Sequence, residues 1–270
     1  MIEIAEELLP CASGEQAFDQ LMHMDGEMFR ELPAEGRRTL RFRCEGRSYF
    51  IKIHRGVGWR EIFKNLFSLR LPVISARNEW RAIERLEQLG ILTTPLVARG
   101  ERGWNPARRE SFVVTRDLGK TISLEDLTAD WREQPPAPAL KWGLVRETAR
   151  IARTLHEHGI NHRDFYLCHF LLDLHQPPDP ARPLLYLIDL HRVQLRRRTP
   201  RRWLVKDIGG LYFSALDVGL TRRDVYRFLR AYFQKPLREV LQNEAGLLAE
   251  FTARAIQNYR IMHGRDPQLP

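Results

Sequence analysis

The chain of 270 residues has only three cysteines and no long apolar run. Cys11, Cys44 and Cys168 are scattered and odd in number, so we expect neither a disulfide framework nor a thiolate metal cluster. Unpaired thiols favour a reducing cytoplasm. No window approaches the roughly 18 uninterrupted apolar residues that a membrane span requires. The segment from Met1 to Glu7 is acidic where a secretory signal is basic, so no export signal is predicted.

Motifs of several other protein classes are also missing. The H-E-x-x-H zinc motif is absent, although His156, His158 and His162 lie close together in the sequence. Residues 156 and 158 project to different sides of a helix, which disfavours a shared metal. There is no internal repeat and no long low-complexity tract, so solenoid and fibrous architectures are excluded.

The composition is that of a folded protein with an excess of positive charge. Hydrophobic residues make up 43% and aromatic residues 10%, which is enough to build a core and excludes general disorder. The 43 Lys and Arg residues outnumber 34 Asp and Glu, for a formal charge of +9. Arginines gather at residues 37–47 and again at 196–202. Such clusters favour an anionic partner: nucleic acid, phosphorylated sugar, nucleotide or acidic lipid.

The hydrophobic pattern changes from strand-like to helical along the chain. Strands are predicted at 39–43 and 48–54 as a hairpin, at 97–100 and 111–115, with a helix at 75–89 between them. After the Pro-rich stretch 134–138 comes a long amphipathic helix that ends at Gly159, then short strands at 170–172 and 184–188, then mostly helix. This predicts an α+β protein with a β-rich first lobe, residues 1–118, and a helical second lobe, residues 119–270.

Four charged elements follow one another in the order that a kinase uses. Lys52 lies within a predicted strand, and Glu79 lies on the next helix. An H-R-D triplet at 162–164 precedes a short strand, and Asp189 ends a second one. Each element alone is weak, but together, in these structural contexts, they predict a phosphotransferase.

The roles follow from the chemistry of phosphoryl transfer, which asks mainly for positioning and charge neutralisation. Lys52 is predicted to bind the α- and β-phosphates of ATP, and Glu79 to hold Lys52 by an ion pair. We prefer Glu79 to Glu84 because it shares a helix face with inward apolar residues. Asp189 is the predicted Mg²⁺ ligand, and Asp164 is predicted to orient the acceptor hydroxyl and accept its proton.

The arrangement resembles the eukaryotic-like protein kinase superfamily and, more closely, the bacterial lipopolysaccharide core heptose(I) kinases. The resemblance is carried by residues 49–56, 76–80, 161–172, 188–192 and 206–217. It implies a bilobal protein-kinase-like fold and ATP-dependent phosphorylation of the 4-hydroxyl of the first heptose of the inner core. It also implies that the protein acts peripherally at the cytoplasmic face of the inner membrane, on nascent lipopolysaccharide.

The chain departs from the protein kinase pattern at several positions. His169 stands five residues after Asp164, where protein kinases have Asn, and is predicted to lie near the metal. Only Gly36 is available between residues 30 and 39 to cover the ATP phosphates. A hinge at 115–118, which includes Asp117, would bind the nucleotide through its backbone.

The segment that follows Asp189 also differs from a protein kinase. It has no glycine after Asp189-Leu190 and no A-P-E motif, and the stretch up to Asp207 is short and rich in arginine. These features favour a glycolipid or small-molecule acceptor over a folded protein. Asp207, which opens a helix, is predicted to anchor the catalytic loop.

Three alternatives remain at this point: a kinase for a soluble alcohol, an inactive kinase-like scaffold, and a nucleic-acid-binding protein. The arginine clusters disfavour the cationic acceptors of aminoglycoside and choline kinases. No nucleic-acid-binding module is recognisable, and we expect no nucleic-acid partner.

The insertion at 56–72, between the Lys52 strand and the Glu79 helix, has its own pattern. Trp59, Ile62, Phe63, Leu66 and Phe67 recur at helical spacing among basic residues. This predicts either a helix packed on the first lobe or a basic amphipathic surface. Such a surface would dock on the anionic inner leaflet or on an acidic protein partner.

Overall fold

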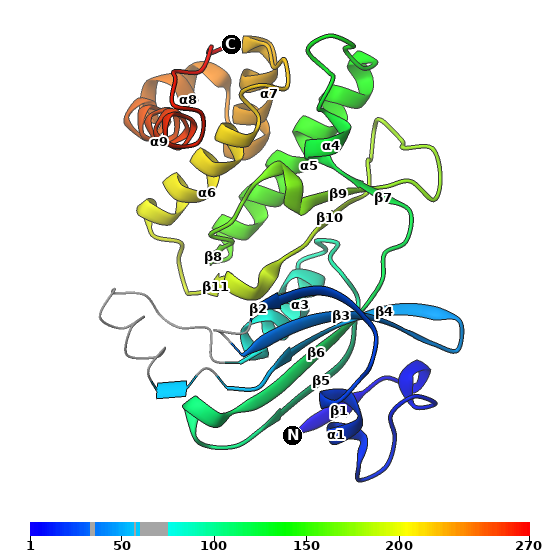
Figure 1. The fold of residues 1–270 in the computed structure, drawn as a ribbon. Helices are drawn as coiled ribbons and strands as arrows, with labels where there is room; N and C mark the ends of the chain where they lie inside the picture. Colours follow the sequence, from blue (N-terminus) through cyan, green and yellow to red (C-terminus); the bar gives the residue numbers. More distant parts are fainter. Residues whose placement is uncertain (33–35, 57, 60–74) are drawn as a thin grey trace. The chain divides into compact units, whose positions relative to one another are not determined.

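The computed structural model describes residues 1–32, 36–56, 58–59 and 75–270 (Figure 1). The described chain forms two compact units. The first consists of Met1–Arg85, Thr94–Gly119 and Leu190–Arg192, and the second of Leu86–Thr93, Lys120–Asp189 and Val193–Pro270. Most of the insertion 56–72, and with it the helix predicted there, lies outside the described residues.

The first unit is built on a six-stranded antiparallel sheet with the order β1-β5-β6-β4-β3-β2. The strands are β1 (Ile2–Ile4), β2 (Glu27–Leu32), β3 (Arg37–Cys44), β4 (Arg47–His54), β5 (Leu96–Arg102) and β6 (Glu110–Arg116). The unit also contains α1 (Ala17–Met22), two 3₁₀ turns, η1 (Glu6–Leu8) and η3 (Pro106–Arg108), and most of α3 (Arg77–Gln88). The predicted hairpin is confirmed: Cys44 pairs with Arg47 across a two-residue turn whose residues both have positive φ.

One face of this sheet carries the core of the unit. Successive side chains of a strand point to opposite faces, so Tyr49, Ile51 and Ile53 of β4 all lie on the same side. They are fully buried in one cluster with α1 residues such as Leu21 and Met22. The residues between them, Lys52 included, point to the opposite face.

The cysteines behave differently from the prediction. Cys11 and Cys44 form a disulfide, with their Cα atoms 6.0 Å apart, while Cys168 is free. The expectation of unpaired thiols was wrong because residues 33 positions apart in the sequence are brought together when the N-terminal segment packs against the end of β3. The cysteine pattern therefore gives no argument about the cellular compartment.

The second unit is mainly helical, as predicted. Its helices are α4 (Leu124–Leu127), α5 (Pro138–Glu157), α6 (Arg201–Ser214), α7 (Arg222–Phe233), α8 (Leu237–Asn243) and α9 (Ala245–His263). Two small sheets join them, with the orders β10-β9-β7 and β11-β8. Their strands are β7 (Thr121–Ser123), β8 (Ile160–Asn161), β9 (Phe170–Asp173), β10 (Leu185–Leu187) and β11 (Gln194–Leu195). Figure 1 shows the helices in green, yellow and orange. None of the helices described here is long and apolar enough to span a bilayer.

A glycine between α5 and β8 allows β11 to approach. Gly159 has a φ of +76°, and a Cβ atom placed on it would overlap the carbonyl of Arg196. The backbone of the two residues is joined by a hydrogen bond from the Arg196 amide to the Gly159 carbonyl, 2.9 Å. The close approach fixes the start of the loop that carries residues 162–164.

Candidate functional site

Lys52 and Glu79 form an ion pair in the first unit. The alternation of β4 turns Lys52 away from the sheet core, and α3 presents Glu79 to it, with Nζ 2.6 Å from Oε1. The Glu79 side chain is 6% exposed, whereas that of Lys52 is 30% exposed. Glu84, one turn further along α3, pairs instead with Arg99. The pair thus joins a buried carboxylate to an ammonium group that is partly exposed.

A second contact ties α3 to the segment after Asp189. The side-chain amide of Asn78 donates to the backbone carbonyl of His191, 2.8 Å away. His191 lies in η5 (Leu190–Arg192), which belongs to the first unit. Asn78, the residue before Glu79, therefore joins α3 to η5 within the first unit.

The catalytic loop of the second unit is held by one buried carboxylate. Asp207 of α6 is 0% exposed, and its two oxygens accept the backbone amides of His162 and Arg163, at 2.7 and 2.9 Å. The ring of His156 lies beside the same carboxylate and is hydrogen-bonded to the hydroxyl of Tyr232, 2.7 Å. This is the anchoring role expected of Asp207. Arg163 has a φ of +77°, which a non-glycine residue keeps only where its surroundings enforce it.

His162 links the loop to the strand that leads to Asp189. Its Nε2–H donates to the carbonyl of Ile188, 3.0 Å away, and its side chain is fully buried. Burial holds the pKa of His162 below its usual value, consistent with a neutral ring. The amide of Ile188 donates in turn to the carbonyl of His169, so both loops are locked together.

His169 connects Asp164 with Asp189. Its Nδ1 lies 2.7 Å from the backbone carbonyl of Asp164, which can only accept, so Nδ1 carries a proton. Its Nε2 lies 3.6 Å from Oδ2 of Asp189. In the neutral ring Nε2 therefore has no proton, and its lone pair faces the carboxylate oxygen of Asp189. A cation that binds both atoms would stabilise this arrangement. Asp189 itself has a φ of +61°, so both carboxylate-bearing loops contain a strained residue.

These residues fit Mg²⁺ as part of a nucleotide complex. Among the described residues no group of three or more His, Cys, Asp or Glu is placed to hold a metal by itself. Mg²⁺ in nucleotide sites needs only one or two protein ligands, because phosphates and water supply the others. One carboxylate with an imidazole nitrogen beside it meets that requirement.

The other two predicted cofactor residues have structural contacts in the first unit. Gly36 has a φ of +60°, and its backbone lies so close to Gly56 that a Cβ would overlap the Gly56 carbonyl. Asp117 pairs with Arg41 and accepts the amide of Gly119, at 2.7 and 2.9 Å. Burial alone would raise the pKa of Asp117, but these hydrogen bonds outweigh it and lower the pKa. Nucleotide binding by either residue stays a prediction and concerns its backbone.

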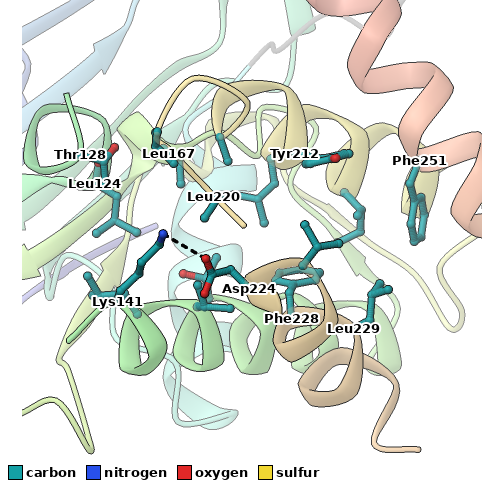
Figure 2. Close-up of a pocket in the computed structure, with 18 of the residues that line it drawn as sticks. Leu124, Thr128, Lys141, Leu167, Tyr212, Leu220, Asp224, Phe228, Leu229 and Phe251 are labelled. Carbon is teal, nitrogen blue, oxygen red and sulfur yellow. Dashed lines mark hydrogen bonds and ion pairs between the residues drawn. The ribbon is translucent and has the colours of Figure 1, made fainter. Parts of the chain in front are cut away.

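The second unit also contains an apolar cavity of about 170 Å³ (Figure 2). Its wall is mostly aliphatic and aromatic, with Leu124, Leu167, Leu220, Phe228 and Phe251 labelled in the figure. Two charged side chains lie in this wall as an ion pair, Lys141 Nζ to Asp224 Oδ2 at 3.0 Å. Burial alone would raise the pKa of Asp224, but its hydrogen bonds to Thr221 and Lys141 lower it, so the pair is ionised.

Comparison with known proteins identifies the family. The model of the lipopolysaccharide kinase (Kdo/WaaP) family matches residues 19–232. The chain belongs to this family.

Individual members of the family are similar over nearly the whole chain. The lipopolysaccharide core heptose(I) kinase WaaP of Pseudomonas aeruginosa PAO1 is 53% identical over 247 residues, which are 92% of this chain and 91% of that protein. WaaP of Escherichia coli is 49% identical over 94% of this chain and 96% of its own. A solved structure of WaaP in complex with acyl carrier protein has a TM-score of 0.83 at 47% identity, and covers 96% of this chain and 99% of that one.

Membership confirms three predictions: the resemblance itself, the α+β kinase-like fold and the enzyme class, a phosphotransferase that uses ATP. The sequence did not reveal the cavity, the disulfide or the support that His156 and Tyr232 give to Asp207. The only sequence signal for the last was His156, just before the end of α5, which the sequence analysis considered only as a metal ligand.

Proposed function

We propose that the protein transfers the γ-phosphoryl group of ATP to the 4-hydroxyl of the first heptose of the lipopolysaccharide inner core. The observation that carries the proposal is the 48–53% identity, over 92–94% of the chain, to proteins named lipopolysaccharide core heptose(I) kinases. The geometry is compatible with it, because the side chains that phosphoryl transfer needs are held by buried partners in both units.

In this proposal Lys52 binds the α- and β-phosphates of ATP, and Glu79 keeps its ammonium group in place. Asp164 orients the heptose hydroxyl and accepts its proton as the new bond forms. Asp189, with His169 beside it, holds Mg²⁺, which neutralises the phosphate oxygens when it is bound with ATP. The amides fixed by Asp207 keep the Asp164 loop in one conformation throughout.

The experiment is an incubation of the protein with ATP, Mg²⁺ and a heptose-containing core acceptor, with NMR to locate the phosphate in the product. The expected product carries one phosphate at the 4-position of the first heptose. Acceptors without heptose, unrelated sugars and the Asp164→Asn variant serve as controls. Phosphate at another position, or equal ATP use with water alone, would contradict the proposal.

We further propose that an acyl carrier protein is a partner. The family member in the similar solved structure is in complex with one, and this chain carries a formal charge of +9, which suits an acidic protein. An acyl group needs an apolar binding site, and the cavity of the second unit offers one (Figure 2). The insertion 56–72, predicted to dock on an acidic partner or on the inner leaflet, is the candidate surface in the first unit.

Two forms of the carrier protein test this partnership. The acyl form should bind more tightly than the form without an acyl chain. Leu220→Trp, which fills the cavity, should remove this difference, whereas Leu241→Trp, at a 40% exposed residue of α8, should preserve it. Equal binding of both forms by the wild-type protein would exclude the cavity as the acyl site.

The proposed reaction takes place at the cytoplasmic face of the inner membrane. ATP is available on that side, and the acceptor is a membrane glycolipid under construction. Attachment to the membrane surface itself is part of this proposal, through the basic residues of the insertion 56–72.

A further inference from the structure

His169 and Asp189 lie at the same end of two paired strands of the second unit. His169 stands just before β9, and Asp189 follows the end of β10. Phe170 and Leu187, the terminal residues of these strands, pair in the antiparallel sheet. The amide of Ile188 then donates to the carbonyl of His169, 3.0 Å away. The backbone of the two residues is therefore held together by sheet pairing.

The ring of His169 is oriented as in a histidine that binds a metal. Its Nδ1 lies 2.7 Å from the backbone carbonyl of Asp164 and donates to it. Histidines that bind a metal almost always donate the N–H of the other ring nitrogen to a carbonyl or a carboxylate, because this bond fixes the ring. The rings of His162 and Tyr166 lie beside it, with centroids 5.8 and 6.3 Å away. One hydrogen bond and two neighbouring rings thus direct Nε2.

The distance between Nε2 of His169 and Oδ2 of Asp189 suits a shared ion better than a hydrogen bond. It is 3.6 Å, longer than the roughly 2.7–3.2 Å of an N–H···O bond. Two atoms that each lie about 2.1 Å from one divalent ion are about 3.0 to 4.2 Å apart, depending on the angle at the ion. The two side chains are 20% and 26% exposed, so phosphate and water can supply further ligands.

A nitrogen beside an oxygen favours a different ion from two oxygens. Mg²⁺ is a hard ion that prefers oxygen, whereas imidazole suits first-row transition ions. Mn²⁺ accepts both kinds of ligand. Where protein kinases place an asparagine, whose amide oxygen suits Mg²⁺, this chain offers the ring nitrogen of His169. The exchange therefore changes the chemistry of the ligand while the carboxylate of Asp189 is kept.

We propose that His169 and Asp189 bind Mn²⁺ in preference to Mg²⁺, together with the phosphates of the nucleotide. Nε2 of His169 and Oδ2 of Asp189 are the two protein ligands. The inference deepens the proposed function and rests on it, because the nucleotide supplies other ligands of the ion. Mg²⁺ still binds through Asp189, phosphate and water, so the proposed reaction proceeds with either ion.

Pulsed EPR of Mn²⁺, bound with a non-hydrolysable ATP analogue, shows directly whether a nitrogen is a ligand. The protein is prepared once with ordinary histidine and once with histidine labelled with the heavy nitrogen isotope, which separates a ring nitrogen of the protein from one of adenine. The wild-type protein should give a nitrogen coupling that changes with the label. A wild-type protein without this coupling, with Mn²⁺ bound elsewhere or not bound, overturns the proposal.

Two histidine variants assign the coupling. It should be lost in His169→Asn and kept in His158→Asn. His158 is the matched control, because it is an exposed residue of the same unit whose Nδ1 also lies 2.8 Å from a backbone carbonyl, that of Thr154. A coupling that persists in His169→Asn would contradict the assignment of Nε2.

Calorimetric titrations of the protein and the ATP analogue with each ion measure the preference. Loss of a group that supports a metal ligand costs about 10–100-fold in affinity, so loss of the ligand itself in His169→Asn should weaken Mn²⁺ binding at least about tenfold. The affinity for Mg²⁺ should change by about threefold or less, since the asparagine offers an oxygen. An equal fall for both ions, or no fall for either, would contradict the preference.

None of these measurements uses an acceptor, so the two proposals can fail separately. A protein that gives the label-dependent coupling but does not phosphorylate the core glycolipid contradicts only the proposed function. A protein that phosphorylates the glycolipid with Mg²⁺, and shows no nitrogen coupling to Mn²⁺, contradicts only the metal preference.

Discussion

The two units hold their functional charges in different ways. In the first, one ion pair between β4 and α3 places an ammonium group that is 30% exposed. In the second, a carboxylate that is 0% exposed fixes the backbone of a whole loop, and through it the positions of Asp164 and its neighbours. The partly exposed ammonium group of Lys52 can contact a ligand at low cost, whereas the buried carboxylate of Asp207 cannot be lost without disturbing the fold. We therefore expect changes in the first unit to affect ATP binding and changes at the anchor to affect stability as well.

The largest effect is expected at Asp189. Asp189→Ala removes the only carboxylate of the proposed metal site and should abolish the part of ATP binding that depends on Mg²⁺. Titrations of nucleotide with and without Mg²⁺ measure it. His169→Ala should weaken the same Mg²⁺ dependence less, because the carboxylate remains. A full Mg²⁺ effect in Asp189→Ala would show that the metal is held elsewhere.

Removal of the anchor is expected to have the next largest effect. Asp207→Ala leaves two buried amides without an acceptor, at a cost of about 2–5 kcal/mol in the free energy of unfolding. Activity should fall in the protein that remains folded, because the loop loses its fixed conformation. Urea denaturation checks the stability, and Asp130→Ala, at an exposed aspartate of the same unit, is the control. A wild-type denaturation midpoint in Asp207→Ala would refute the contrast between the units.

The ion pair is expected to matter for function and little for stability. Lys52→Met and Glu79→Gln should each lower kcat/KM for ATP. The double variant should be scarcely worse than either single variant, because each substitution alone already breaks the same ion pair. The free energy of unfolding should change by about 1 kcal/mol or less in Glu79→Gln, because this variant leaves no buried charge unpaired and the side chain of Lys52 is 30% exposed. Glu84→Gln provides the control on the same helix. Additive losses would mean that the two residues act separately.

A smaller effect is expected from His54, which lies two residues after Lys52. Burial, followed by the nearby charges of Arg37, Lys52 and His191, lowers the pKa of His54 to about 3. The folded state therefore binds fewer protons than the unfolded state between pH 3 and about 6.5, and stability falls as the pH is lowered through this window.

His54 alone can change the free energy of unfolding by at most about 1.4 kcal/mol per pH unit. His54→Phe should remove this part of the pH dependence between pH 6.5 and 5, where most carboxylates stay ionised. Denaturation midpoints of both proteins across this range measure it. Parallel curves for the two would exclude His54 as the source.

The comparison also explains what the sequence could and could not predict. The hairpin, α3 and α5 were visible because local alternation or helical periodicity marks them, and Lys52, Asp164 and Asp189 because each sits at a fixed place in such an element. The Cys11–Cys44 disulfide and the contact of His156 with Tyr232 depend on residues that are far apart in the sequence or on rotations of side chains. Strand β2 was missed since its alternation is weak and it lies at the sheet edge.

The proposed chemical role of Asp164 is the centre of the account, and single-turnover phosphoryl transfer in Asp164→Asn tests it most directly. The variant keeps the shape of the side chain but loses its negative charge and its ability to accept a proton. We predict transfer to the core acceptor that is slower by about 10²–10⁴, with ATP affinity and melting temperature unchanged in the same samples. Near-normal transfer by Asp164→Asn would contradict the account.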